Sequence, residues 1–209
     1  YLPGANHIVD INTDQYGYIE ELGDTQLFKR KTLLNPFFTL DDVRLNGRIH
    51  IVSSPFQEAA LDGEVDVITL FEVADRTANV DELFGKMHRM LRESGLCFMT
   101  DILISGFDLQ TLWDKAENIF PPDRLNVFSV EGLKALFRRH GFECLEFSTP
   151  GILDVEIVEK AIEHHLEAKV SRFTEYLLRN RSIETRKSFQ EFLQKNLLSS
   201  YGRILLQKM

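Results

Sequence analysis

The residues after the first predicted strand have part of the pattern of a nucleotide-binding loop. Residues 7–11 are a short apolar run that predicts a buried strand, and polar residues follow it up to Gly17. Loops that hold a nucleoside or dinucleotide carry glycines because the backbone must approach the ligand without side chains in between. Those positions here hold Asn12, Asp14 and Gly17. Since only the third is glycine, the motif alone is a weak indication of a nucleotide site.

A second strand is predicted over residues 25–31, and it ends in three basic residues. Nucleotide-binding sheets place an acidic residue there, which accepts hydrogen bonds from the ribose diol. Lys29, Arg30 and Lys31 take that place in this chain. They could suit the 2′-phosphate of NADP and so an oxidoreductase, but the incomplete glycine loop argues against that hypothesis. We expect these residues to form a solvated strand end.

The histidines and cysteines do not have the spacing of a metal site. His164 and His165 are adjacent, so on a helix their side chains diverge by about 100° and cannot hold one metal from one face. No Cys/His spacing indicates zinc. Cys97 and Cys144 lie in apolar runs and are too few for a disulfide framework, which favours a reducing, cytoplasmic location.

Strands and helices alternate along the first three quarters of the chain. The clearest strand is residues 65–71, and the helix after it has an apolar stripe, with Asn79 as its N-cap and Glu82 as the reciprocal partner. Another helix begins after Ser129 and ends before Gly141. The remaining predicted elements are a helix over residues 16–22 closed by Gly23, helical turns over 40–45, and strands over 48–53, 95–104, 142–148 and 201–206. This alternation predicts an α/β fold with a doubly wound, mainly parallel sheet.

The region between the sixth and seventh predicted strands differs from the rest, because it is helical and highly charged. A strand that returns after such an excursion is expected to rejoin the same sheet. We therefore predict an α/β core over residues 1–154, a helical insertion over 155–199 and a final core strand over 200–209. Ligands of such sheets bind at the carboxyl ends of the strands.

Composition limits the class of protein. The chain has 209 residues, a net charge of -8 and 44% hydrophobic residues, which is typical of a globular domain with a full core. The acidic excess disfavours nucleic-acid binding, which depends on basic surface. No run is long and apolar enough for a transmembrane helix, and no signal-peptide pattern opens the chain, so we expect no membrane partner. The chain starts at Tyr1 rather than Met, which is consistent with a natural N-terminus upstream.

The central stretch carries a specific resemblance. Residues 64–73, followed by residues 79–83 and 91–96, resemble class I S-adenosylmethionine-dependent methyltransferases of the bacterial type 11/12 group. The resemblance spans residues 7–209 and is strongest over 64–158. It implies a Rossmann-like seven-stranded sheet whose last strand is antiparallel and lies between the fifth and sixth. It also implies S-adenosylmethionine as the cofactor.

Carried over position by position, the resemblance implies the site residues. The implied catalytic residues are Glu72, Asp75 and Asp101, and the implied cofactor-binding residues are Asp10, Asn12, Asp14, Gly17, Ser54, Pro55, Phe56 and Phe71. The chain departs from the family pattern in three places. Asn12 and Asp14 replace glycines, the acid after strand two is missing, and Arg76 replaces a histidine. An arginine stays protonated and cannot act as a base near neutral pH.

Two functions follow from this pattern. The first is methyl transfer to a small-molecule or saccharide acceptor, in which the enzyme mainly positions donor and acceptor. The alternative is a catalytically inactive methyltransferase homologue that acts as a binding or scaffold partner, because cofactor elements are altered while the scaffold is kept. The helical insertion would be the contact surface of such a scaffold protein, or equally a lid or a homodimer element in an active enzyme.

Overall fold

The computed structural model describes residues 4–12, 16–35, 49–117, 119, 123–164 and 170–209. They form one seven-stranded sheet with the order β3-β2-β1-β4-β5-β7-β6. The strands are β1 (His7–Ile11), β2 (Arg30–Leu34), β3 (His50–Val52), β4 (Val65–Phe71), β5 (Leu91–Ile102), β6 (Phe142–Ser148) and β7 (Tyr201–Lys208). Neighbours from β3 to β5 are parallel, and β7 is antiparallel to both β5 and β6. The predicted fold, with the last strand antiparallel between the fifth and sixth, is confirmed.

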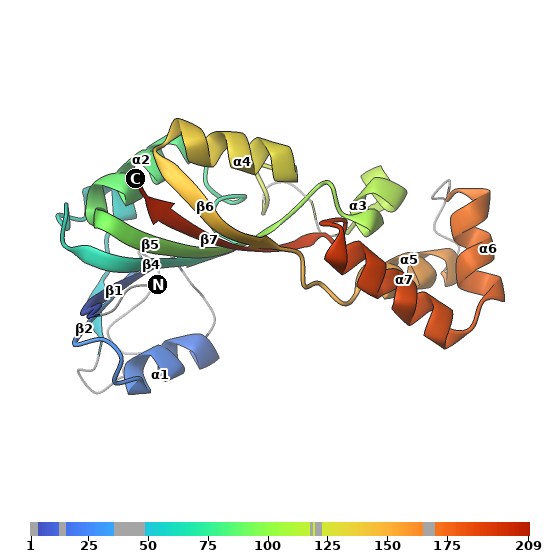
Figure 1. Cartoon of the computed structure of the whole chain (residues 1–209), viewed down its shortest axis with the longest axis horizontal. Helices are drawn as coiled ribbons and strands as arrows, with labels where there is room; N and C mark the ends of the chain where they lie inside the picture. Colours follow the sequence, from blue (N-terminus) through green and yellow to red (C-terminus); the bar gives the residue numbers. More distant parts are fainter. Residues whose placement is uncertain (1–3, 13–15, 36–48, 118, 120–122, 165–169) are drawn as a thin grey trace.

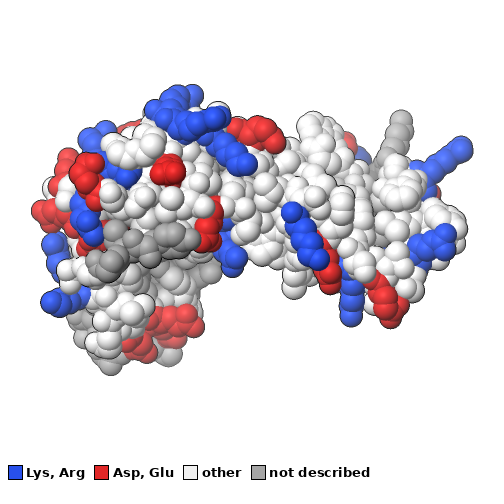
Figure 2. Space-filling model, in the orientation of Figure 1, with Lys and Arg blue, Asp and Glu red and all other residues white. Residues whose placement is uncertain are grey.

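Helices cover the sheet unevenly (Figure 1). The α-helices are α1 (Tyr16–Asp24), α2 (Val80–Met90), α3 (Phe107–Leu112), α4 (Val130–Arg139), α5 (Asp154–Glu163), α6 (Arg172–Asn180) and α7 (Ile183–Lys195), and short 3-10 helices are η2 (Phe56–Glu58) and η3 (Trp113–Lys115). Helices α2 and α4 lie on one face of the sheet and α1 lies on the other, whereas α3 and α5–α7 gather beyond the end of the central strands (Figure 1). On the face shown in Figure 2, basic side chains lie over α4 and acidic side chains lie over α1.

The helix predictions rest on packing and capping that the structure confirms. Leu83, Phe84 and Met87 are completely buried on the inner face of α2, where they join the main core under α2 and α4. Asn79 Oδ1 accepts a hydrogen bond from the Glu82 amide at 3.1 Å, and Ser129 Oγ accepts one from the Gly132 amide at 3.0 Å. Each cap satisfies one of the amides that a helix leaves free at its start.

The predicted bounds of the second strand were wrong. The strand begins at Arg30 instead of ending at Lys31, and its apolar body runs to Leu34. Lys31 is not solvated: its side chain is buried, and its ammonium group donates hydrogen bonds to the carbonyl oxygens of Gly23, at 2.8 Å, and Thr25. The long aliphatic stem of a lysine can be buried in this way while its charge finds acceptors.

Two further boundaries can be compared with the prediction. Helix α1 continues through Gly23 to Asp24, and β5 begins at Leu91 rather than at Gly95 because Leu91 pairs with Val65 of β4. The predicted helical turns over residues 40–45 lie outside the described residues. The predicted division of the chain at residues 154 and 199 stays a prediction.

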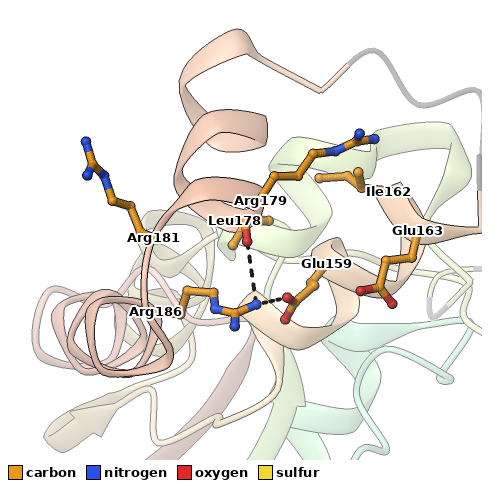
Figure 3. Close-up of a pocket in the computed structure, with 7 residues that line it drawn as sticks. All are labelled: Glu159, Ile162, Glu163, Leu178, Arg179, Arg181 and Arg186. Atoms are coloured by element: carbon orange, nitrogen blue, oxygen red, sulfur yellow. Dashed lines mark hydrogen bonds and ion pairs between the residues drawn. The ribbon is translucent and has the colours of Figure 1, made fainter.

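Helices α3 and α5–α7 have an apolar core of their own, which includes Leu109, Val158, Leu178 and Leu193. A pocket of about 440 Å³ lies among α5, α6 and α7 (Figure 3). Arg186 of α7 points across it, forming an ion pair with Glu159 and donating to the carbonyl oxygen of Leu178 at 3.5 Å. Since none of its lining residues comes from the sheet, this pocket is separate from the carboxyl ends of the strands. Among the described residues, no helix has the length and apolar character needed to cross a bilayer.

A buried polar cluster joins this helical region to the sheet. Asp154, at the start of α5, accepts hydrogen bonds from Ser199 Oγ at 2.7 Å, the Ser200 amide at 2.6 Å and Gln190 Nε2 at 2.7 Å. Asp108 of α3 is completely buried nearby. Its burial raises the pKa of Asp108 to about 6, and the negative charge of Asp154 adds to the shift. The junction therefore contains a carboxyl group that stays protonated to a higher pH than a solvent-exposed carboxyl group does.

Replacement of Asp108 by Asn should stabilise the protein at alkaline pH. Because the pKa of Asp108 is higher in the folded state than in the unfolded state, its contribution is fully present below about pH 4 and is lost as the pH rises through about 6. A shift of this size corresponds to about 3 kcal/mol. Urea unfolding at pH 5 and pH 8 should show a smaller difference between the two pH values for Asp108→Asn than for the wild type. Asp114→Asn is the control, because the Asp114 side chain is exposed. An unchanged pH dependence in Asp108→Asn would contradict the prediction.

Candidate functional site

The carboxyl ends of β1 and β4 meet at the centre of the sheet, because these two strands are parallel neighbours. Asp10 pairs in register with Thr69, and Thr69 Oγ1 donates a hydrogen bond to Asp10 Oδ2 at 2.7 Å. The Tyr18 hydroxyl group, from the start of α1, lies 2.9 Å from the same Thr69 oxygen. Asp10, a predicted cofactor residue, therefore lies in a buried network at the edge where α/β sheets bind ligands.

Asn12 follows β1 in the left-handed region of backbone conformation, with φ of 56°. Glycine takes this conformation freely, and asparagine is among the few other residues that take it readily. Its amide donates to the Leu34 carbonyl oxygen at 2.8 Å, while its side-chain Oδ1 is buried without a hydrogen-bond partner among the described residues. Asparagine in place of the family's glycine thus keeps the backbone conformation and adds an acceptor that no described residue uses. Asp14 lies outside the described residues.

The other glycine position differs. Gly17 lies in the first turn of α1, and a Cβ atom added there would meet nothing within 4 Å. No close approach of the backbone therefore requires a glycine at this position among the described residues.

The residue at the carboxyl end of β2 is Asn35, which is buried and whose amide donates to the Val52 carbonyl oxygen at 3.2 Å. Arg30 and Lys31 lie at the opposite end of this strand. The basic strand end that suggested NADP was therefore a misplacement of the strand. Asn35 therefore stands where the family has an acid.

The predicted residues after β3 have three different environments. Ser54 is half-buried, and the exposed Pro55 accepts a hydrogen bond at its carbonyl oxygen from the Glu58 amide at 3.0 Å. Phe56 is buried in the main core. Phe71, at the end of β4, is half-buried and makes edge-to-face contacts with Tyr18 at 4.7 Å and Phe98 at 5.9 Å between ring centroids.

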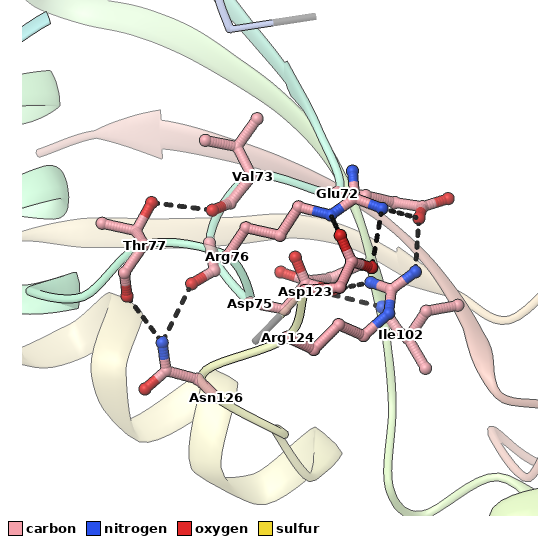
Figure 4. Close-up of polar contacts among 11 residues, drawn as sticks. Glu72, Val73, Asp75, Arg76, Thr77, Ile102, Asp123, Arg124 and Asn126 are labelled. Atoms are coloured by element: carbon pink, nitrogen blue, oxygen red, sulfur yellow. Dashed lines mark hydrogen bonds and ion pairs between the residues drawn. The ribbon is translucent and has the colours of Figure 1, made fainter. Parts of the chain in front are cut away.

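The loop after β4 begins with a second left-handed residue, Glu72, with φ of 53°. Its amide donates to the Thr100 carbonyl oxygen of β5 at 2.9 Å. Its Oε2 atom accepts a hydrogen bond from Arg124 Nη2 at 2.7 Å and lies 3.7 Å from Arg76 Nη2 (Figure 4). Non-glycine residues keep this conformation only where their surroundings enforce it, and such residues are frequent at functional sites.

Asp75 lies deeper in the same network. It is completely buried and forms an ion pair with Arg124, whose side chain is only 9% exposed (Figure 4). The Asp75 carbonyl oxygen accepts hydrogen bonds from the amides of Leu125 and Asn126 at 2.7 and 2.9 Å. Asn126 Nδ2 in turn donates to the Thr77 carbonyl oxygen at 2.7 Å. Arg124 and Asn126 therefore fasten the segment before α4 to the loop after β4.

Sequence reasoning missed the roles of Arg124 and Asn126, although both lie in a segment that carries the family resemblance. The resemblance assigned no partners to them. Their partners are about fifty positions away in the chain, with separations of 52 for the Arg124–Glu72 hydrogen bond and 49 for the Asn126–Thr77 one. Nothing in the local pattern indicates such contacts.

Asp101 lies near the end of β5 and is completely buried. Its Oδ1 atom accepts a hydrogen bond from the Ile102 amide at 3.0 Å, and its Oδ2 atom has no hydrogen-bond partner among the described residues. Burial raises the pKa of Asp101 to about 8, and the charge of Glu72 raises it further while that of Arg76 opposes the shift. Perturbed carboxyl groups of this kind are candidates for proton transfer near neutral pH.

The structure thus brings the predicted residues into two groups. Asp10 lies in β1, Asn12 follows that strand, and Phe71 is the last residue of the neighbouring strand β4. Glu72, Asp75 and Asp101 lie around the ends of β4 and β5, joined by ion pairs or by charge. Over the ranges that the structure describes, no group of three or more His, Cys, Asp and Glu side chains is arranged to hold a metal ion.

Loss of Arg124 should destabilise the protein strongly. Arg124→Gln leaves the buried carboxylate of Asp75 without its cation, and removal of one partner of a buried ion pair costs about 3–5 kcal/mol. Urea unfolding at pH 7 measures the change. Arg139→Gln removes an exposed arginine from its ion pair with Asp81 and should change the free energy of unfolding far less. Equal effects of the two substitutions would show that the buried pair does not hold the loop.

Comparison with known proteins agrees with this geometry. Residues 7–146 match the family described as "Methyltransferase domain". No curated protein matches the sequence. A S-adenosylmethionine-dependent methyltransferase from Archaeoglobus fulgidus shares 14% identity, with a TM-score of 0.62 over 100% of this chain and 88% of its own.

Two further solved structures have the same fold. A putative sarcosine dimethylglycine methyltransferase from Galdieria sulphuraria shares 16% identity, with a TM-score of 0.59 over 98% of this chain and 78% of its own. A 1,6-didemethyltoxoflavin-N1-methyltransferase from Burkholderia thailandensis, solved with bound 1,6-didemethyltoxoflavin and S-adenosylhomocysteine, shares 12% identity, with a TM-score of 0.57 over 98% of this chain and 72% of its own. The family match covers well over half of the chain, and the sheet order is that of the class I S-adenosylmethionine-dependent fold. The chain therefore belongs to the methyltransferase domain family.

Proposed function

We propose that this protein transfers a methyl group from S-adenosylmethionine to a small-molecule or saccharide acceptor at the carboxyl ends of β1, β4 and β5. The observation that carries the proposal is a pair of buried oxygen atoms without partners among the described residues, Asn12 Oδ1 and Asp101 Oδ2. An unsatisfied buried acceptor is costly, so its presence at two places along the strand-end edge, one after β1 and one on β5, favours a ligand that donates to it. S-adenosylmethionine supplies a reactive methyl group on a sulfonium when it is bound.

The residues at and after the end of β1, which we call the cofactor half of the site, fit that ligand. Asn12 Oδ1 can accept a hydrogen bond from an ammonium group, and the carboxylate of Asp10 makes the end of β1 favourable for a positively charged ligand. Asn35 can bond the ribose hydroxyl groups in place of the missing acid. We assign to the same half, on the family resemblance, Asp14, Gly17, Ser54, Pro55, Phe56 and Phe71.

The ends of β4 and β5 form what we call the acceptor half of the site, and there we assign separate roles to the three carboxyl groups. Glu72, with 24% of its side chain exposed, contacts the acceptor and is held in place by Arg76 and Arg124. Asp75 holds Arg124. Asp101 takes the proton of the acceptor, because its Oδ2 atom has no hydrogen-bond partner among the described residues and its pKa of about 8 is close to working pH. Asp101 is buried, so the acceptor must displace the side chains that cover it.

Binding of S-adenosylhomocysteine tests the cofactor site directly. Isothermal titration should give saturable 1:1 binding to the wild type. Asn12→Gly keeps the left-handed backbone conformation and removes only the acceptor, so it should weaken binding by about tenfold to a hundredfold, as expected for a hydrogen bond to a charged group. The absence of heat at millimolar ligand would overturn the proposal and favour the inactive homologue that acts as a binding or scaffold partner.

The pH dependence of the reaction tests Asp101. Acceptors come from a panel of amines, phenols and saccharides screened with radiolabelled S-adenosylmethionine. If ionised Asp101 is the base, kcat/KM rises with pH toward a plateau with a midpoint near 8. Asp101→Asn should lose this rise and most of the rate, typically a hundredfold or more. A wild-type profile that is flat from pH 6 to 9 would exclude the assignment.

The acceptor class rests on indirect support. The Burkholderia relative was solved with a small heterocyclic molecule, and the Galdieria relative is described by small amino-acid derivatives. Both favour a small molecule as the first part of the panel to screen. The homodimer expected from the helical insertion stays a prediction, which sedimentation of the purified protein can test.

A further inference from the structure

We infer that Tyr18 is a positioning residue for the cofactor half of the site, acting through Thr69 on Asp10. We call these three side chains the hydroxyl relay. The inference rests on the proposed cofactor site, and it adds a residue that neither the family resemblance nor the comparisons assign. Its basis is that one hydroxyl group on β4 bonds side chains from both ends of the segment that connects β1 with α1.

The positions in the chain explain why this matters. Asp10 belongs to β1 just before that segment, and Tyr18 belongs to the first turn of α1 just after it. Thr69 is 59 positions from Asp10 and 51 positions from Tyr18, and it belongs to the rigid central strand of the sheet. The relay therefore fixes the start of α1 and the end of β1 to one point on β4.

The direction of the hydrogen bonds follows from proton counting. An ionised Asp10 can only accept, so the single hydroxyl proton of Thr69 is used in the bond to Asp10 Oδ2. The oxygen of Thr69 is then left as an acceptor, and Tyr18 must donate to it. Burial raises the pKa of Tyr18 and the charge of Asp10 adds to the shift, so the phenol keeps the proton that it donates. The chain of bonds is thus polarised toward Asp10.

The aromatic ring of Tyr18 is held separately from its hydroxyl group. It packs edge-to-face on Phe71 at 4.7 Å between ring centroids, and Phe71 packs on Phe98. Tyr18→Phe therefore removes the donated hydrogen bond and leaves the ring contacts. The substitution isolates the relay from the packing of α1 on the sheet.

The relay matters in this chain because the residues after β1 depart from the glycine pattern of nucleotide-binding loops. Asn12 is held in a left-handed conformation by the hydrogen bond that its backbone amide donates to the Leu34 carbonyl oxygen. The relay fixes Asp10 two positions before it, and so sets where the Oδ1 atom of Asn12, which has no partner among the described residues, stands relative to the carboxylate of Asp10. A cationic ligand that uses both groups needs them at a constant separation.

The test compares matched variants by titration with S-adenosylhomocysteine. Tyr18→Phe and Thr69→Val should each weaken binding by about tenfold, the size expected for one hydrogen bond in a polar network. Thr100→Val is the control for Thr69→Val, since Thr100 is on the next strand and its buried hydroxyl has no partner among the described residues. Tyr176→Phe is the control for Tyr18→Phe, since Tyr176 lies on α6 with its hydroxyl bonded to Arg181. Both controls should bind within twofold of the wild type.

A second measurement separates failure of the relay from failure of the proposed function. Amide hydrogen exchange at Asn12 and Tyr18 in the unliganded protein should accelerate by at least tenfold in Tyr18→Phe, with no change at Leu83 in α2. If the wild type does not bind S-adenosylhomocysteine but exchange accelerates, the proposed function fails and the relay stands. If exchange at both positions is unchanged and the variant binds as tightly as the wild type, the relay is wrong.

Discussion

Burial of several carboxyl groups at one edge of the sheet is the constraint on which the rest of this site depends. Asp10, Asp75 and Asp101 are completely buried, and Glu72 lies beside them. A buried carboxylate is stable only with donors or cations around it, and otherwise takes up a proton. The protein uses each solution once: Thr69 donates to Asp10, Arg124 neutralises Asp75, and burial raises the pKa of Asp101. The parallel pairing of β1, β4 and β5 brings these different environments together.

Two left-handed residues frame the edge. Asn12 ends β1 and Glu72 ends β4, and each is bonded through its amide to the neighbouring strand. The chain therefore turns out of the sheet at two adjacent strands without glycine. At Asn12 the side chain tolerates the conformation, whereas at Glu72 the bonds to Arg124 and Thr100 enforce it. In the proposed function, the first turn belongs to the cofactor half of the site and the second to the acceptor half.

The sequence was sufficient for the elements with strong local signals. Strand β4, helix α2 with its Asn79 cap and the antiparallel last strand agree with the prediction, because apolar periodicity and capping are local properties. The predicted bounds of β2 were wrong because Lys31 is a charged residue that is buried in the folded protein. A pattern of residue types does not show where its ammonium group finds acceptors. Of the predicted site residues, Asp10, Asn12, Phe71 and Glu72 lie at or just beyond the carboxyl ends of β1 and β4, Phe56 lies in the main core, and the roles of all of them stay predictions. The bonds among them could not be predicted, since Arg124 meets Glu72 and Tyr18 meets Thr69 only after folding.

The position of Arg124 has a consequence for reading sequence variation in the family. One guanidinium group serves both the folding of the loop after β4, through Asp75, and the placement of Glu72. Natural selection against unfolding alone is enough to preserve it, even in a lineage that has stopped methylating anything. Retention of arginine at this position therefore carries no information about activity. Asn12 and Asp101 each have a buried side-chain oxygen atom without a hydrogen-bond partner among the described residues, so stability alone gives less reason to keep them, and variation at these two positions is the better test of the proposed function.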